Sequence, residues 1–488
     1  MSNYDYDLAI IGSGGGAFSA AIRATGLGKR VLMVERGTIG GTCVNTGCVP
    51  SKALLAAAEA RHTAADAAGR FPGIGSSAGP VDMGALIAGK QALVESMRQE
   101  KYVDLAADYG WDVVQGEASF SGTPGEPVLT ITHDGGALAS VEARSSVTAQ
   151  HYLVATGSSP WIHPIEGLPE VDYLTSTTAM ELSEIPESLL VLGGGYVALE
   201  MAQLFARLGT RVTMLVRSRL ASHEEPEASR ALMGVFADEG IHVVRRAAVA
   251  SVGTDPLTGE VVAVAEVGSV GAKERQEFRA ARVLVAMGRR PVTRALNLKE
   301  VGVETGESGE IVVDDTLATT NPRVWAAGDV TGHPEFVYVA AHHGALVVEN
   351  AFTGAGRTVD YRHLPRVTFT SPALGAVGLT DKQARESGYR CECRVLPLEY
   401  VPRAIVNRDT RGFIKIVAEA ATGKILGVTA VAKDAGELAA AGVYLLEAGM
   451  TVDQVAAMWS PYLTMAEGIR IAAQSYTADV SRLSCCAV

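Results

Sequence analysis

Two cysteines near the start of the chain have a spacing suited to redox chemistry. Cys43 and Cys48 are separated by four residues and lie in the segment 40–52, whose sequence is GGTCVNTGCVPSK. A structural zinc site usually spaces its cysteines more closely and supplies a second pair nearby, and no such pair follows in this sequence. A zinc half-site and two buried structural thiols are the alternatives. The context favours a redox-active dithiol that lies against a flavin.

The other four cysteines also occur in pairs. Cys485 and Cys486 are adjacent at the chain end, and a disulfide between neighbours needs a strained ring. Exposed thiols are a liability unless they have a role, and paired thiolates on a flexible arm suit the capture of a soft metal ion. An incidental terminal pair is the alternative. Cys391 and Cys393 flank Glu392, so a strand would point both to one face; we interpret them as structural.

The first thirty-five residues have the pattern of a dinucleotide-binding unit. An apolar strand runs into a glycine-rich turn with Gly12, Gly14 and Ala17, a helical stretch follows, and a second strand ends at Glu35. The glycines let the backbone approach a pyrophosphate at the helix N-terminus, and the acid can bind ribose hydroxyls. A tight turn without a ligand is the alternative. The order strand, turn, helix, strand, acid favours a bound dinucleotide.

A second unit of this kind follows the strand 189–192, which leads into a turn with Gly193 and Gly195. Two such fingerprints in one chain imply two dinucleotides. The next strand ends without an acid and is followed by Arg217 and Arg219. An acid there would bind the 2′-OH of NAD, whereas arginines suit the 2′-phosphate of NADP. We therefore expect NADPH at this site, with a solvated basic turn as the alternative.

The remaining segments predict further helices and a third kind of domain. Alanine-rich and amphipathic stretches predict helices over 51–70 and 83–109. Beyond about Gly356, short β-rich runs are followed by helical stretches over 435–448 and 464–475. That mixture is typical of an α+β domain.

Length, composition and charge limit the possible classes of protein. A chain of 488 residues predicts about three domains, and its 48% hydrophobic residues supply ample core. The net charge of 42 − 54 = −12 argues against nucleic acid, whose binders usually show a basic face. The chain has no apolar run of eighteen residues and opens without a basic leader, so we expect no membrane span, no signal peptide and a soluble cytoplasmic protein.

With these motifs, the chain resembles the class I pyridine nucleotide-disulfide oxidoreductases over nearly its full length. The resemblance rests on the dithiol segment, on GGGYVALE, AAGD and PYLTMAEG further along, and on the terminal SCCAV. It implies an α/β fold with two Rossmann-like dinucleotide-binding domains of the glutathione reductase type and a C-terminal α+β dimerisation domain. The implied boundaries are 1–158 and 284–355 for a discontinuous FAD-binding domain, 159–283 for the NADPH-binding domain and 356–488 for the dimerisation domain.

The resemblance also implies roles for individual residues. Cys48 would be the thiolate nearest the flavin and Cys43 the outer thiol, and a nearby positive charge and helix start should lower the pKa of the active-site thiol. Lys52 would pair with Glu200 near the flavin ring, and Asp329 would bond to the ribityl chain. The residues expected to bind FAD are Gly12, Gly14, Ala17, Glu35, Gly41, Thr42, Lys52, Thr156, Gly157 and Asp329. The residues expected to bind NADPH are Gly193, Gly195, Tyr196, Glu200, Arg217, Arg219 and Gly288.

One substitution within the family pattern bears on the substrate. Family members that reduce disulfides carry a His-Glu pair near the C-terminus, and the histidine is the general acid-base that thiol exchange requires. In this chain Tyr462 occupies the place of that histidine, and the last histidine is His363. An enzyme of thiol exchange would lack its base, whereas one that passes electrons to a metal ion would not need it.

These features resemble the branch of the family that reduces Hg(II) to Hg(0) with NADPH and FAD. In this hypothesis Hg(II) arrives as a thiol complex, binds the terminal cysteine pair, and is exchanged to Cys43 and Cys48. The resemblance makes the tail act on the other subunit's active site, which requires a homodimer. Tyr102 and the partner subunit's Tyr462 would line the pocket. Tyr196 would swing aside when NADPH docks.

Two other functions stay open at this point. One is a disulfide reductase such as dihydrolipoamide dehydrogenase or glutathione reductase. The other is a non-catalytic flavoprotein that sequesters Hg(II) without metal-dependent NADPH oxidation. Many relatives carry an additional N-terminal metal-binding module, and this chain starts at the first Rossmann strand; we expect the difference to concern metal delivery and not the catalytic core.

Overall fold

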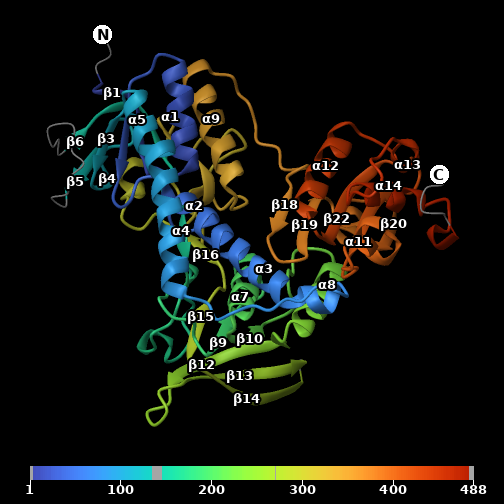
Figure 1. Ribbon diagram of the computed structural model, residues 1–488. Helices are drawn as coiled ribbons and strands as arrows, with labels where there is room; N and C mark the ends of the chain where they lie inside the picture. Colours follow the sequence, from blue (N-terminus) through green and yellow to red (C-terminus); the bar gives the residue numbers. More distant parts are fainter. Residues whose placement is uncertain (1–3, 134–145, 270, 483–488) are drawn as a thin grey trace. The chain divides into compact units, whose positions relative to one another are not determined.

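The computed structural model describes residues 4–133, 146–269 and 271–482. The described residues form two compact units, and each unit is assembled from three segments of the chain. The first unit takes residues up to 53 together with 84–161 and 288–359, and the second takes 54–83, 162–287 and the residues from 360 onward. Both units are therefore discontinuous in sequence, and Figure 1 allows each segment to be followed by its colour.

A five-stranded parallel sheet forms the centre of the first unit. Leu8, Ile10 and Leu153 are fully buried in it, as expected for parallel strands that are covered on both faces. All of its described pairings are parallel. In spatial order the strands are β17 (Val324–Ala326), β7 (Ala149–Val154), β1 (Tyr6–Ile11), β2 (Val31–Glu35) and β3 (Asp112–Gln115).

Two helices on one side of this sheet pack in unusually close contact. They are α1 (Gly15–Gly26) and α9 (Val337–Thr353), which run side by side in Figure 1. A Cβ placed on Gly344 would lie 2.0 Å from the carbonyl oxygen of Gly16. Only glycine at this position lets the two helices approach so closely, and the approach holds α1 behind the turn that follows β1.

The other elements of the first unit surround this core. A small antiparallel sheet is formed by β4 (Glu117–Gly122), β5 (Pro127–Thr132) and β6 (Ser146–Val147), and β8 (Ser158–Pro160) pairs with β16 (Arg289–Pro291). The helices are α2 (Gly41–Asn45), the start of α3 (Cys48–Arg70), α4 (Met83–Arg98), the π-helix η1 (Gln99–Asp104), α5 (Leu105–Asp108), η3 (Leu298–Val301) and η4 (Gly328–Thr331).

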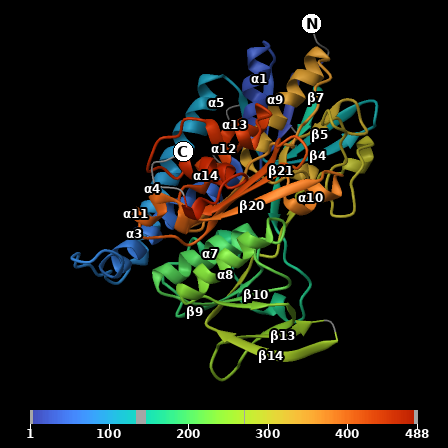
Figure 2. The ribbon, with the colours of Figure 1, turned by 90° about the vertical axis from the view of Figure 1, so that its right-hand side faces the viewer.

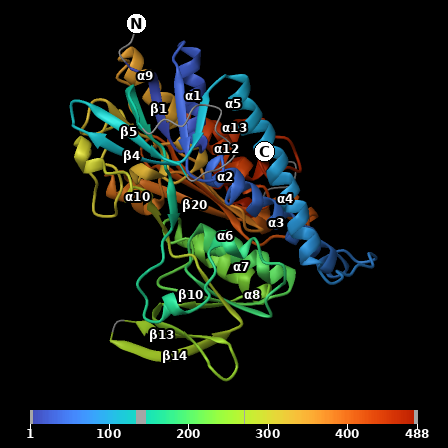
Figure 3. The same ribbon diagram turned by 90° about the vertical axis from the view of Figure 1, so that its left-hand side faces the viewer.

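The second unit contains a second parallel sheet. Its strands, in spatial order, are β11 (His242–Arg245), β10 (Arg211–Val216), β9 (Ser188–Leu192) and β15 (Arg282–Val285). Helices α7 (Tyr196–Leu208) and α8 (Pro226–Asp238) cover one face, and an antiparallel meander covers the other, as Figures 2 and 3 show. The meander consists of β12 (Ala247–Thr254), β13 (Val261–Ser269) and β14 (Ala272–Ala280). Each parallel sheet thus has its own glycine-rich turn and helix.

An antiparallel sheet with helices forms the rest of the second unit. Its strands, in spatial order, are β18 (Arg366–Thr368), β19 (Ala373–Gly378), β22 (Ile425–Ala432), β21 (Phe413–Glu419) and β20 (Cys391–Pro397). All eight residues of β22 are buried, as befits the central strand. The remaining helices are η2 (Leu168–Glu170), α6 (Ser176–Ala179), α10 (Asp381–Glu386), η5 (Leu398–Tyr400), α11 (Pro402–Val406), α12 (Ala435–Glu447), α13 (Val452–Ala457), α14 (Glu467–Gln474) and η6 (Val480–Arg482).

The fold class expected from the sequence is confirmed, since both parallel sheets and the C-terminal α+β part are present. The helix expected over 83–109 is present but is interrupted by η1, a π-helical segment. Such segments hold one extra residue in a turn and often occur at functional sites. The three domain boundaries stay a prediction. Among the described helices, none has the length and apolar character needed to cross a bilayer.

A buried ion cluster ties helices of the second unit together. The Arg207 guanidinium in α7 donates to both oxygens of Glu239, with Nε–Oε2 at 2.8 Å and Nη2–Oε1 at 2.7 Å, and it also binds the Glu59 carboxylate in α3. The side chains of Arg207 and Glu239 are only 4% and 5% exposed. Without Arg207, Glu239 would keep the hydrogen bond from Gln203 Nε2 at 3.1 Å and the longer contacts of His62 and Arg411, at 3.8 and 3.6 Å.

We expect Arg207→Met to lower the free energy of unfolding by about 3 kcal/mol, because it leaves a buried carboxylate without its main partner. The matched control is Arg211→Met, since Arg211 pairs with Glu187 on the surface, where the side chains are 73% and 81% exposed. That change should cost less than about 1 kcal/mol. Urea denaturation followed by circular dichroism measures both. Equal losses of unfolding free energy in the two variants would show that the buried ion cluster of Arg207 does not stabilise the fold more than the surface pair of Arg211 does.

Candidate active site

The dithiol segment lies in the first unit, across the junction of α2 and α3. Cys43 is in the middle of α2, Cys48 is the first residue of α3, and both are half-buried thiols that form no disulfide. Gly40 and Gly41 precede them with φ of +105° and +65°. A Cβ on Gly41 would lie 2.5 Å from Gly14 Cα. This contact, which only glycine permits, brings the dithiol segment against the turn at the start of α1.

The two thiols influence each other's ionisation. The pKa of Cys43 is raised well above its ordinary value, first by the hydrogen bond between its side chain and Cys48, and then by burial and by the charge of Cys48. Lys52 acts in the opposite direction. At Cys43 the pKa is therefore raised, although the positive charge of Lys52 has the expected sign; the lowered pKa expected for the thiolate nearest the flavin, Cys48, stays a prediction. The reduced pair keeps a proton on Cys43 that it shares with Cys48.

Tyr102 lies beside the dithiol and is held there by the π-helix. Its ring packs edge-on against Phe18, with centroids 4.7 Å apart, and a Cβ on Gly40 would lie 3.3 Å from Tyr102 Cγ. Burial raises the pKa of Tyr102, and the charges of Cys43 and Cys48 raise it further. The phenol therefore keeps its proton and can donate a hydrogen bond toward the sulfur atoms.

Asn45 and Arg98 also organise the dithiol segment, although neither was predicted from the sequence. Asn45 Nδ2 donates to the carbonyl oxygens of Ile39 at 2.9 Å and Gly41 at 3.0 Å. Arg98 Nη1 donates to Asn45 Oδ1 at 3.1 Å. The signal for Asn45 was its place between the two cysteines, where a short polar side chain can bond to nearby backbone. Arg98 had no signal, because it is distant in sequence.

The first glycine-rich turn offers a site for a pyrophosphate. Gly12 has φ of +102°, and a Cβ there would lie 2.5 Å from the carbonyl oxygen of Ala155, so the turn depends on glycine. Among the described residues no side chain caps the start of α1 at Gly14. Its first N–H groups are therefore available to an anion. Ala17 is fully buried one turn further along and permits close packing of the helix.

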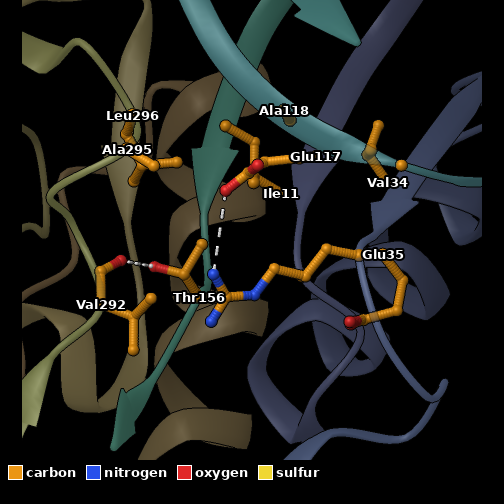
Figure 4. A pocket seen from close by; sticks show the side chains of 12 residues that line it. Ile11, Val34, Glu35, Glu117, Ala118, Thr156, Val292, Ala295 and Leu296 are labelled. Carbon is orange, nitrogen blue, oxygen red and sulfur yellow. Dashed lines mark hydrogen bonds and ion pairs between the residues drawn. The ribbon is translucent and has the colours of Figure 1, made fainter. Parts of the chain in front are cut away.

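A pocket lies beside the ends of β1 and β2 (Figure 4). Glu35 closes one side, where its carboxylate accepts hydrogen bonds from Ser13 Oγ at 2.6 Å and from Gly37 N at 2.7 Å. Thr156 Oγ1 donates to the carbonyl oxygen of Val292 at 2.7 Å. The pocket is lined by Ile11, Gly12, Val34, Glu35, Arg36, Gly116, Glu117, Ala118, Thr156, Val292, Ala295 and Leu296. Three residues expected to bind FAD thus line one pocket, and the pocket and the uncapped helix fit the two ends of an adenosine diphosphate group.

Asp329 belongs to a hydrogen-bonded chain at the start of η4. Ser158 Oγ donates to Asp329 Oδ2 at 2.7 Å, and Arg289 Nε donates to Ser158 Oγ at 2.7 Å. These bonds orient the Asp329 carboxylate. Asp329 was predicted from the sequence, whereas Ser158 and Arg289 were not. Gly157, with φ of +67°, and Gly288, with φ of +127°, lie next to them in the chain.

The second glycine-rich turn lies in the second unit, between β9 and α7. Tyr196 follows Gly195 at the start of α7, and its hydroxyl donates to Glu224 Oε1 at 2.7 Å. Glu224 is buried and also binds Arg366 at 2.7 Å, and these partners keep the pKa of its carboxyl below its ordinary value. The Tyr196 ring is thus fastened to a buried ion pair. Glu200 accepts a hydrogen bond from Phe369 N at 2.9 Å.

The two arginines expected to bind a 2′-phosphate have different surroundings. Arg219 donates to the carbonyl oxygens of Ser222 and Glu224, both at 2.7 Å, and so helps to shape its own loop. Arg217 is exposed directly after β10. Arg217 is therefore the better placed of the two to meet an anion.

The remaining residues that were predicted for the active site or the cofactor sites lie in several parts of the chain. Thr42 is exposed in α2, and Gly193 has φ of +133°, with the site of a Cβ only 2.2 Å from the carbonyl oxygen of Ala286. Tyr462 belongs to the second unit and is 48% exposed. Cys485 and Cys486 lie outside the described residues.

Comparisons with known proteins agree with this arrangement. The family model described as pyridine nucleotide-disulphide oxidoreductase matches residues 6–344, and the dimerisation domain of the same name matches residues 364–473. A mercuric reductase from Streptomyces lividans is 58% identical over 482 residues, which cover 99% of this chain and 98% of that protein. A mercuric reductase from Bacillus cereus is 46% identical over 99% of this chain and 74% of that protein. The solved Cu(II) complex of the HOCl-induced flavoprotein disulfide reductase RclA from Escherichia coli has a TM-score of 0.82 at 28% identity, over 97% of this chain and 100% of that chain.

The shared proton makes a testable prediction about Cys43. In the reduced chain, Cys48→Ser removes the sulfur atom that contributes most to the raised pKa of Cys43, so thiolate should form at a lower pH. The midpoint for alkylation of Cys43 by iodoacetamide, followed by mass spectrometry against pH, should fall by at least about one pH unit. Cys391→Ser serves as the control and should leave the midpoint unchanged. An unchanged midpoint in Cys48→Ser would show that Cys48 does not raise the pKa of Cys43.

Proposed function

The chain belongs to the pyridine nucleotide-disulphide oxidoreductase family, and on that basis we propose that it reduces Hg(II) to Hg(0) with NADPH and FAD. The observation that carries the proposal is the combination of a dithiol at Cys43 and Cys48 with a tyrosine, Tyr462, at the place of the family's catalytic histidine. The relatives from Streptomyces lividans and Bacillus cereus are named for the same activity.

The residues of the first unit suit the binding of FAD. The uncapped start of α1 would hold the pyrophosphate, Glu35 the ribose hydroxyls, and Asp329 a hydroxyl of the ribityl chain. When bound, FAD supplies a ring that takes up a hydride from NADPH and passes on an electron pair. Lys52, whose charge partly opposes the raised pKa of Cys43, would contribute positive charge to this part of the site.

The dithiol would bind Hg(II) by exchange of protons for metal. Soft Hg(II) prefers thiolate ligands, and coordination displaces the proton that Cys43 and Cys48 share. Tyr102, which keeps its phenolic proton, would donate a hydrogen bond to a sulfur atom while the metal is bound. Two electrons would then convert Hg(II) to neutral Hg(0), both sulfur atoms would lose their metal bond, and one proton would restore the pair that Cys43 and Cys48 share.

We infer that Hg(II) is delivered as a thiol complex through Cys485 and Cys486. Exchange from one pair of thiolates to another keeps the metal bound to sulfur throughout and avoids a free ion. The match of residues 364–473 to the dimerisation domain supports a homodimer, in which the tail of one subunit would serve the active site of the other. The partner subunit's Tyr462 would then lie at the entrance of the site.

A disulfide reductase is the less favoured function. Thiol exchange needs a group that takes up and returns protons near neutral pH. A tyrosine hydroxyl has an ordinary pKa near 10 and is a poor substitute for an imidazole. We also propose a cytoplasmic location, since the free thiols of the proposed mechanism need a reducing compartment.

The role of the tail is tested by Hg(II)-dependent NADPH consumption in excess bulky thiol. We expect Cys485→Ala/Cys486→Ala to keep its flavin spectrum and to lose at least about 90% of turnover, a change of about 1.4 kcal/mol or more in the barrier. Ser484→Ala, which changes a neighbour of the pair without removing a thiol, is the control. Unchanged turnover would exclude the tail, and faster turnover of oxidised glutathione or lipoamide than of Hg(II) would favour a disulfide reductase.

The choice between NADPH and NADH is tested at Arg217. Arg217→Ala removes a charge that would pair with the 2′-phosphate, and such charge-assisted hydrogen bonds contribute about 1.5–3 kcal/mol. The kcat/KM for NADPH should fall about tenfold or more, while that for NADH should not change. Arg211→Ala, at the exposed start of the same strand, is the control. Equal losses for the two dinucleotides would show that Arg217 does not select the phosphate.

A further inference from the structure

A second group of sulfur ligands lies in the second unit, on residues that the proposed reaction does not use. Cys391 and Cys393 begin β20, which pairs with β21 at an edge of the antiparallel sheet as described. Alternate residues of a strand face the same side, and Asp381 at the start of α10 faces the two thiols. One ligand atom from each of the three residues lies within 4.8 Å of the others. Figure 2 shows α10 next to β20.

The spacing of the two cysteines suits a bridging ion better than a disulfide. Residues two apart in an extended strand have Cα atoms about 6.6 Å apart, near the upper limit for a disulfide, whose usual value is about 5.5–6 Å. In a tetrahedral shell with metal–sulfur bonds of about 2.3 Å, the two sulfur atoms lie about 3.8 Å apart. The ligand atoms of the cluster lie within 4.8 Å of one another, so a movement of about 1 Å at most would bring the sulfur atoms to this distance.

The third ligand is already in contact with the sulfur atoms. Cys391 Sγ lies 3.1 Å from Asp381 Oδ1, while Asp381 Oδ2 accepts from Arg385 at 2.9 Å and Asp381 N donates to Glu225 Oε1 at 2.7 Å. Arg385 thus holds the carboxylate, and Glu225 holds the backbone of the same residue. The Oδ1 atom of this carboxylate faces the thiols. Coordination of Oδ1 to a metal ion would replace the hydrogen bond that it accepts from Cys391.

The charges around the cluster also favour a cation. Burial, the hydrogen bond to Asp381 and the charge of that carboxylate, in this order, raise the pKa of Cys393 to about 12. The neighbouring Lys415 does not compensate fully, since its ammonium group is already bound by Glu225 at 2.9 Å and by Glu227 at 3.3 Å. A divalent cation would remove the repulsion among the three ligands.

We propose that Asp381, Cys391 and Cys393 form a binding site for one soft divalent cation with a filled d shell, the chemical class of Zn(II), Cd(II) and Hg(II). Binding replaces the two thiol protons by two metal–sulfur bonds, so two protons leave for each ion and no electron is transferred. The carboxylate is the third ligand, and water completes the shell. The bound ion connects α10 to the edge strand β20 and stabilises this part of the sheet.

The chain offers a clean test because it has six cysteines in all. Alanine at Cys43, Cys48, Cys485 and Cys486 in the full-length protein leaves only the proposed pair. Cd(II) is then added to the reduced protein without oxygen, and binding is followed by thiolate-to-metal absorption in the ultraviolet and by equilibrium dialysis. We expect one Cd(II) per chain and a rise in melting temperature.

Further substitutions in that background test each ligand. Cys393→Ser should abolish the absorption band, and Asp381→Asn should weaken Cd(II) binding by at least about tenfold. Glu386→Gln, in the same helix but not in the cluster, should bind as the background does. Absence of stoichiometric Cd(II) binding, or binding that survives Cys393→Ser, would overturn the site.

A second arrangement covers failure of the background variant to fold. The otherwise native chain and its Cys391→Ser/Cys393→Ser variant are dialysed against the same Cd(II) solution. The double variant should bind one equivalent less, with its flavin absorbance unchanged. Equal numbers of bound ions in the two proteins would equally overturn the proposal.

Discussion

The candidate active site depends on one constraint: two sulfur atoms are held so closely that the ionisation of one opposes the ionisation of the other. The pKa of Cys43 is raised chiefly by its hydrogen bond to Cys48. Such a pair keeps a proton until something with a higher affinity for sulfur displaces it. A soft metal ion satisfies that condition, and a proton-transfer partner for Cys43 is not needed. The tyrosine at 462, at the place of a histidine, is consistent with this chemistry.

Glycines create the backbone geometry that the constraint needs. Gly41 allows the dithiol segment to approach Gly14 at the start of α1, and Gly344 allows α9 to approach Gly16 in the same helix. The first contact places the thiols beside the proposed pyrophosphate site, and the second fixes the helix that forms this site. A side chain at Gly41 or Gly344 would push these elements apart. A cofactor that contacts both the glycine-rich turn and the dithiol segment needs them to lie close together.

The sequence was sufficient to predict the fold class and most of the local structure, because strand, glycine-rich turn and helix are encoded within about thirty residues. It also identified Glu35 and Thr156, which line one pocket. It did not identify Arg98, Ser158 or Arg289, since their roles arise from contacts between distant segments. The raised pKa of Cys43 was not predicted either, because the second thiol outweighs the nearby positive charge. The two structural cysteines at 391 and 393 became a candidate metal site only when Asp381 was seen beside them.

The π-helical turn at Gln99–Asp104 makes the orientation of Tyr102 depend on chain length in that turn. An α-helix advances by about 100° for each residue, and a π-helical turn accommodates one residue more than an α-helical turn does. Loss of a single residue there would restore a regular helix and would turn Tyr102 about the helix axis relative to the residues on one side of it. The phenol would then leave its place on Phe18. In this region, insertions and deletions therefore alter the site more severely than most substitutions, and natural variation should preserve the residue count even where it changes the residues.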